Sequence, residues 1–151
     1  MKRILLFSLF FGFALIAHGQ TTSPILANYL KLKDALVASD VTKSTQAVAE
    51  LEKSIDASPE FAQKNDLKKQ VAAMAKTTDL EKQRAAFAAV STTVYQAAKS
   101  QKWSNQELFY QYCPMKKTYW LSTESAIKNP YYGSKMLACG SVKETIPAKT
   151  K

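Results

Sequence analysis

The scarcity of glycine constrains the fold of this chain more than any other feature of its sequence. No glycine occurs between Gln20 and Gly133, and the residues between the apolar positions of this stretch are mostly alanine, lysine, glutamine and glutamate. These four residue types favour helix and glycine disfavours it, so the sequence predicts helices from Thr21 to Lys102. The full length of 151 residues fits one ordinary globular domain.

Four apolar stripes at helical spacing lie within this stretch. The Ser23-Pro24 pair predicts the start of the first helix and Ser39 its end, while Asp40 and Asp79 are expected to cap the second and fourth helices. The stripes consist of Ile25, Tyr29, Leu32 and Leu36; Val48, Leu51 and Ile55; Leu67, Val71 and Met74; and Leu80, Phe87, Val90, Val94 and Ala97. We therefore predict a mainly α fold built on an up-and-down four-helix bundle. Met74, the methionine of the third stripe, is expected to fill the core.

The first residues have the pattern of a secretory signal peptide. Lys2 and Arg3 precede an apolar run from Ile4 to Ala17, which is too short for an untilted transmembrane helix. We expect residues 1–19 to be removed and residues 20–151 to form a single periplasmic or secreted domain that is not embedded in a membrane. The removed part includes His18, the only histidine.

The net charge of +9 suggests a nucleic-acid or membrane-surface binder at first sight. Removing the predicted signal peptide lowers the charge to +7 and leaves Arg84 as the only arginine, so the bidentate contacts typical of nucleic-acid readers are scarce. Residues 20–98 carry a net charge of +1 and residues 99–151 carry +6. Most of the excess positive charge therefore lies in the C-terminal part, where lysines would lower thiol pKa values or steer an acidic partner.

Catalytic signatures are absent from the expected mature chain. It has no histidine, no phosphate-binding glycine loop and no C-x-x-C motif. We therefore expect no enzyme activity.

The residue composition changes at about Trp103. Residues 103–146 hold both cysteines and most of the aromatic residues of the expected mature chain, and they predict a small irregular segment with short strands or turns after the bundle of residues 20–102. Alternation predicts strands at 108–112 and 118–121. A turn is expected at 129–133, with Gly133 left-handed, followed by a helical turn that Gly140 ends. The last residues, 147–151, are expected to form a disordered tail.

Four sulfur-bearing residues of this segment form two closely spaced pairs. Cys113 and Met115 share a face of an extended segment, and Met136 and Cys139 share a face of a helical turn. Thiolate and thioether ligands together favour Cu(I), and zinc fits less well without histidine. The spacing thus indicates a soft-metal site, with Trp120 and neighbouring tyrosines limiting its access to solvent.

The same two cysteines also fit a disulfide. A bond between Cys113 and Cys139 would close a loop of 25 intervening residues in a compartment that permits disulfides. The chain-entropy treatment gives such a crosslink about 3 to 4 kcal/mol. The residues alone leave the metal site and the disulfide open as alternatives.

A set of ordered motifs resembles the family known as domain of unknown function 3347. The motifs are Tyr29 to Leu36, Tyr112-Cys113-Pro114-Met115, Tyr119-Trp120-Leu121-Ser122, Ile127 to Gly133, Met136 and Cys139-Gly140. Together with the helical layout, they extend the resemblance over nearly all of the expected mature chain.

The resemblance implies an exported helical protein in a heavy-metal context. Similar domains are appended to periplasmic adaptor subunits of heavy-metal efflux pumps, and the family's cysteine and methionine positions match Cys113, Met115, Met136 and Cys139. We therefore expect a protein that buffers or delivers a soft metal ion, Cu(I) above all, with a periplasmic efflux component as a partner. The alternative is a disulfide-stapled helical module that binds a protein partner without metal.

Overall fold

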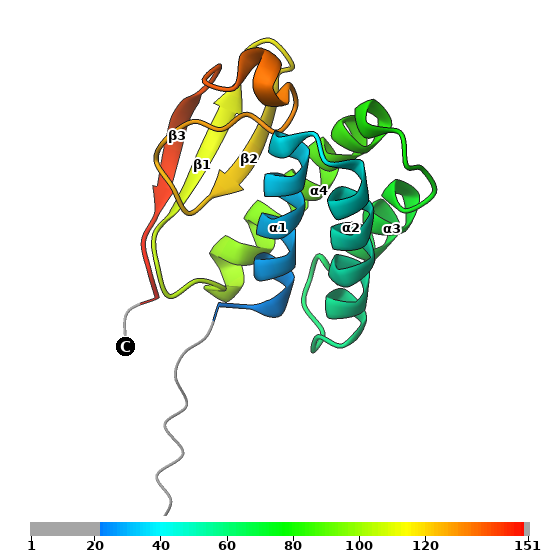
Figure 1. Ribbon diagram of the computed structural model, residues 1–151. Coiled ribbons are helices and arrows are strands. Elements are labelled where there is room, and N and C mark those ends of the chain that lie inside the picture. The colour runs from blue at the N-terminus through cyan, green and yellow to red at the C-terminus, as the bar shows by residue number, and fades with distance from the viewer. Residues whose placement is uncertain (1–21, 150–151) are drawn as a thin grey trace, which may run out of the picture.

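The computed structural model describes residues 22–149, so the predicted signal peptide (1–19) and the last two residues lie outside the described part. Four helices come first along the chain and a three-stranded antiparallel sheet follows, which makes the fold mainly α (Figure 1). Within the described residues, every helix falls short of the length and apolar character that a membrane span requires.

The four helices form the predicted bundle. Their bounds are Pro24–Ala38 for α1, Val41–Asp56 for α2, Lys64–Met74 for α3 and Leu80–Gln101 for α4. Each helix packs on the next one in sequence, and α4 returns to contact α1 (Figure 1). Two predicted caps are confirmed, because Asp40 Oδ1 accepts from Lys43 N at 2.9 Å and Asp79 Oδ1 accepts from Lys82 N at 2.8 Å.

The predicted apolar stripes supply the core. All of their members are buried except Leu80, which is partly buried, and Met74 is a fully buried core residue as predicted. Tyr29 joins the bundle to the sheet: its ring stacks on Phe87, its hydroxyl lies 2.7 Å from Ser91 Oγ, and that hydroxyl accepts a hydrogen bond from Leu121 N. Burial raises the pKa of Tyr29, which keeps this hydroxyl neutral.

The sheet contains one strand that the sequence did not predict. Its strands are Leu108–Cys113 (β1), Thr118–Ser122 (β2) and Ser141–Ile146 (β3), in the order β2-β1-β3. The first two confirm predicted strands. The sequence does not predict β3, because its exposed and partly buried residues give little apolar alternation. A register shift between Tyr110 and Gln111 marks an irregularity where β1 pairs with β3.

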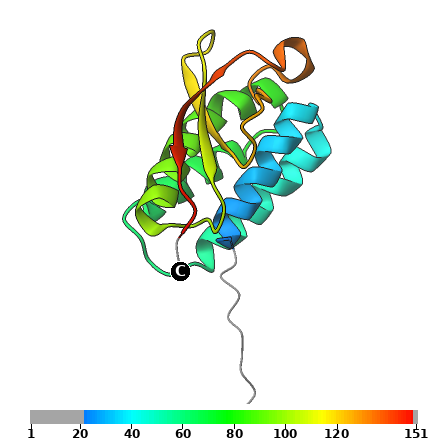
Figure 2. The same ribbon diagram turned by 90° about the vertical axis from the view of Figure 1, so that its left-hand side faces the viewer.

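The two faces of the sheet have different neighbours. Tyr110 stacks on Tyr95 of α4, with ring centroids 3.8 Å apart. The next residue, Gln111, points to the opposite face and donates from Nε2 to the carbonyl oxygens of Glu124 and Ser125. The segment from 123 to 140 therefore covers the face away from α4 (Figures 1 and 2).

Beyond β3, the described part of the expected tail is attached to the fold. Lys149 N donates a hydrogen bond to Ser104 O at 3.0 Å. This bond places residue 149 beside the loop that precedes β1.

Candidate metal centre

The sheet register brings the two cysteines together. Tyr112 pairs with Ser141 across β1 and β3, so the end of β1 lies beside the residues that lead into β3. Gly140 allows this close approach, because a Cβ atom there would lie 2.8 Å from Tyr112 O and 2.9 Å from Trp120 Cη2. The Cys139-Gly140 pair therefore lies directly against the Tyr112-Cys113 pair.

Cys113 and Cys139 are neighbouring free thiols. Cys113 is fully buried at the end of β1, whereas Cys139 is partly exposed. Burial raises the pKa of the Cys139 thiol, and the adjacent Cys113 raises it further. A partly exposed thiol beside a buried one leaves the pair accessible from one side.

The expectation that nearby lysines lower the thiol pKa values is wrong for Cys139. Its pKa is raised, and no lysine is among the groups that shift it. The lysines of the hairpin turn and of the 3₁₀ helix are exposed to solvent, where water screens their charge. The Cys139 thiol is therefore protonated at neutral pH, and a metal ion would have to displace its proton.

The two methionines are much more exposed than the cysteines. Met115 lies in the β1–β2 hairpin turn with 62% of its surface exposed, and Met136 ends the 3₁₀ helix η1 (Gly133–Met136) with 37% exposed. Cys139 N donates to Met136 O at 3.1 Å, which places Met136 one turn before Cys139. The structure thus brings the cysteines together and leaves both methionines at the surface, one near each cysteine in sequence.

The centre has no further ligands of the common metal-binding types. Within residues 22–149, no group of three or more histidine, cysteine, aspartate or glutamate side chains is arranged to hold a metal ion. A metal site at this place would therefore rest on the sulfur atoms of Cys113, Met115, Met136 and Cys139, and these four ligands stay a prediction.

Trp120 lies beneath the cysteine segment. Its side chain is fully buried, its Cη2 atom approaches Gly140, and its ring meets Tyr131 edge-on with centroids 6.1 Å apart. Trp120 and Tyr131 therefore cover one side of the cysteine segment, and their role in shielding a metal ion stays a prediction.

Asn129 holds the segment that carries Cys139, a role the sequence did not reveal. Its side-chain Nδ2 donates to Cys139 O at 2.7 Å, and its backbone N donates to Leu137 O at 2.8 Å. Its Oδ1 accepts from Tyr131 N at 2.8 Å. The sequence identified residues 129–133 only as a turn, although a buried asparagine in a turn commonly bonds to backbone in this way.

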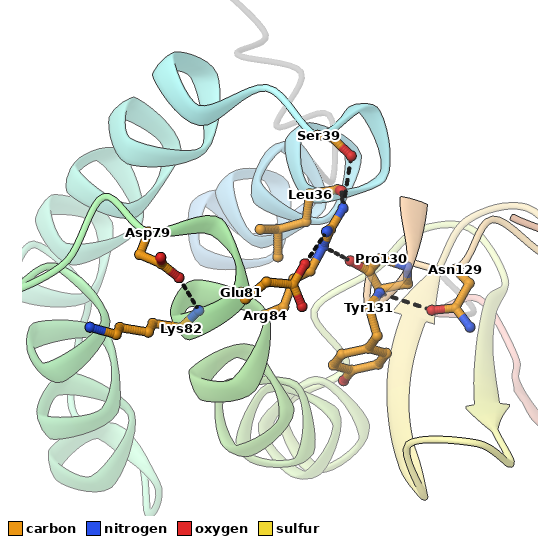
Figure 3. Close-up of polar contacts among 9 residues, drawn as sticks. All are labelled: Leu36, Ser39, Asp79, Glu81, Lys82, Arg84, Asn129, Pro130 and Tyr131. Atoms are coloured by element: carbon orange, nitrogen blue, oxygen red, sulfur yellow. Dashed lines mark hydrogen bonds and ion pairs between the residues drawn. The ribbon is translucent and has the colours of Figure 1, made fainter. Parts of the chain in front are cut away.

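Arg84 on α4 fixes the same turn from the other side (Figure 3). Its buried guanidinium donates from Nε to Pro130 O at 3.0 Å and from Nη2 to Leu36 O and Ser39 Oγ, each at 2.8 Å. Nη1 contacts Glu81 Oε1 at 2.7 Å. Arg84, the sole arginine of the expected mature chain, therefore has a structural role. The one sign of this role in the sequence is that a single arginine occurs among many lysines.

Gly133 fits into the same contact region, and its predicted left-handed backbone is confirmed. Its φ is +56°, and a Cβ atom would lie 2.7 Å from Ser39 Oγ and 2.8 Å from Arg84 Nη2. Only glycine fits this combination of backbone and space. Arg84, Asn129 and Gly133 together position the segment that presents Cys139.

One family matches the chain. It is described as "Protein of unknown function (DUF3347)", and the match covers residues 25–106, more than half of the sequence. No curated protein and no solved structure matches. The matched range contains the helix bundle and ends before β1, so the four sulfur residues lie outside it.

Proposed function

This chain belongs to the DUF3347 family, whose description assigns no activity, and we propose from the chemistry of its cysteine pair that it is an exported soft-metal-binding protein. Its metal is Cu(I), and its role is to buffer the ion or deliver it to a periplasmic component of heavy-metal efflux. The observation that carries this proposal is the contact between the two cysteine-bearing segments: Tyr112 pairs with Ser141, and Gly140 lies against Tyr112 O, so Cys139 lies beside Cys113.

The chemistry of the sulfur ligands selects the metal. Two adjacent thiolates bind Cu(I) strongly, and thioethers add preference for Cu(I) over harder ions. Cys113 and Cys139 supply most of the affinity, while Met115 and Met136 complete the coordination from the exposed side. The open position of Cys139 gives the ion an entry path from solvent.

A competition titration tests this function. The reduced protein is titrated with Cu(I) against a chromophoric chelator, and we expect one ion to be withdrawn from the chelator per chain. The C113S/C139S variant should lose this binding, and M115L and M136L should weaken it. M74L serves as the control, because Met74 is a fully buried core methionine far along the chain from the cysteines. Unchanged affinity in C113S/C139S would refute the proposal.

The same contact supports a second candidate, a disulfide-stapled interaction module without metal. Two neighbouring thiols in an oxidising compartment can form a bond, and a bond here would join the end of β1 to the segment before β3. Intact-mass analysis of protein isolated from the exported fraction separates the candidates. A mass deficit of two hydrogens with no free thiol favours the staple, and free thiols or bound copper favour the metal site.

A further inference from the structure

Three apolar side chains are exposed at one end of the molecule. Met115 in the hairpin turn, Met136 at the end of η1 and Leu137 directly after it expose 62%, 37% and 41% of their surfaces. The hairpin turn and η1 both lie at the end opposite the C-terminus (Figures 1 and 2). We call these three residues the apolar tip. The hairpin turn and η1 form two separate projections at this end (Figures 1 and 2).

The two projections are held together by a contact between their bases. Lys116 Nζ lies 5.2 Å from the centroid of the Tyr132 ring, which directly precedes η1. Arg84 also fixes the turn before η1 through Pro130 O. The backbone that carries the apolar tip is therefore held in place by these two contacts.

Three lysines beside the apolar tip have no acidic partner. Lys116, Lys117 and Lys135 are exposed, and among the described residues none of the three has a carboxylate within 4.0 Å. On the bundle, Lys31, Lys64 and Lys68 each pair with an acidic residue, and bundle lysines without such a pair lie among more numerous carboxylates. Between residues 108 and 143 the sequence has five lysines and one acidic residue. The positive charge at this end is thus uncompensated.

We propose that the apolar tip and its lysines dock the protein on an anionic lipid surface. In the metal-free protein, the methionine and leucine side chains would enter the boundary between headgroups and acyl chains, while the lysines pair with lipid phosphates. Because a lipid surface is fluid, it can take up both projections without having a complementary shape. Because the lysines are positively charged, the protein should prefer an anionic lipid surface to a neutral or cationic one. Docking in this way leaves the C-terminus directed away from the lipid.

Vesicle sedimentation tests the docking in metal-free buffer. Wild-type protein should sediment with phosphatidylglycerol vesicles and remain in the supernatant with phosphatidylcholine vesicles. The K116Q/K117Q/K135Q variant should bind the anionic vesicles about tenfold to a hundredfold more weakly. The M115Q/L137Q variant should also bind more weakly, because it removes the apolar contribution at two exposed positions.

Matched controls separate docking from net charge and from metal binding. K53Q/K69Q/K76Q removes three exposed lysines from the bundle and should retain most of the binding, and C113S/C139S should bind vesicles like the wild type. Far-UV circular dichroism checks that every variant is folded. Equal loss in both lysine variants, or no preference for phosphatidylglycerol, overturns the proposal. Binding to soluble polyglutamate but not to vesicles also overturns it and assigns the apolar tip to an acidic protein.

Discussion

Single residues decide how the cysteine pair is presented. Arg84 bonds to the backbone of the turn before η1, Asn129 bonds to the backbone of Cys139 after η1, and Gly133 leaves room for the guanidinium. None of these contacts follows from helical periodicity, because each joins residues that are far apart in sequence. The sequence located the cysteines and the turn, but the residues that hold them in contact became visible only in the structure.

Replacing Arg84 should destabilise the whole fold. R84M leaves the carbonyl oxygens of Leu36 and Pro130 without their donor, and R84K keeps the charge but cannot reach both. We expect each variant to lower the free energy of unfolding by about 2 to 4 kcal/mol, with R84M the larger loss, measured by urea denaturation. K82M, on the same helix and exposed (Figure 3), is the control. A loss below about 0.5 kcal/mol in R84M would show that the contacts of Arg84 are dispensable.

At the scale of secondary-structure elements, helices were predictable and the edge strand was not. The caps at Asp40 and Asp79 and the buried stripes are local patterns, and they gave the bundle correctly. The strand β3 forms through backbone pairing with β1 and through a contact with α4: Glu144 accepts from Tyr95 OH at 2.6 Å and pairs with Lys99 Nζ at 2.7 Å. A contact between residues so far apart in sequence produces no periodic pattern from which the strand could be predicted.

The attachment of β3 to α4 should depend on pH. Contacts with Lys99 and Tyr95 lower the pKa of Glu144, so the stability they add is present above the carboxyl group's ordinary pKa and is lost as the pH falls through the lowered value. E144Q should therefore lower the free energy of unfolding by about 1 kcal/mol or less near neutral pH, since the pair is partly exposed.

The difference between E144Q and the wild type should shrink toward zero at an acidic pH low enough to protonate the wild-type carboxylate. Urea denaturation at both pH values measures this difference. E107Q, which removes an exposed carboxylate without an ion pair of 4.0 Å or less among the described residues, should show no such pH-dependent loss. An equal difference at both pH values in E144Q would contradict the assigned role of the ionised group.

At the scale of the molecule, the helical part and the sulfur-bearing part differ in their contents. The bundle supplies most of the core and carries most of the paired lysines, whereas the sheet end holds the thiols, the exposed methionines and most of the net positive charge. The charge split and the change of composition near Trp103 predicted this division. The spacing of the sulfurs did not predict their depth, because burial of Cys113 and exposure of Met115 depend on how the 123–140 segment folds over the sheet.

Copper X-ray absorption spectroscopy on the reduced protein, loaded with one equivalent of Cu(I) and passed through a desalting column, tests the central proposal most directly. We predict retained copper with a shell of sulfur neighbours, and loss of that copper in C113S/C139S. Copper that is washed away, or a shell of nitrogen and oxygen that persists without the two cysteines, would contradict a soft-metal function for this cysteine pair.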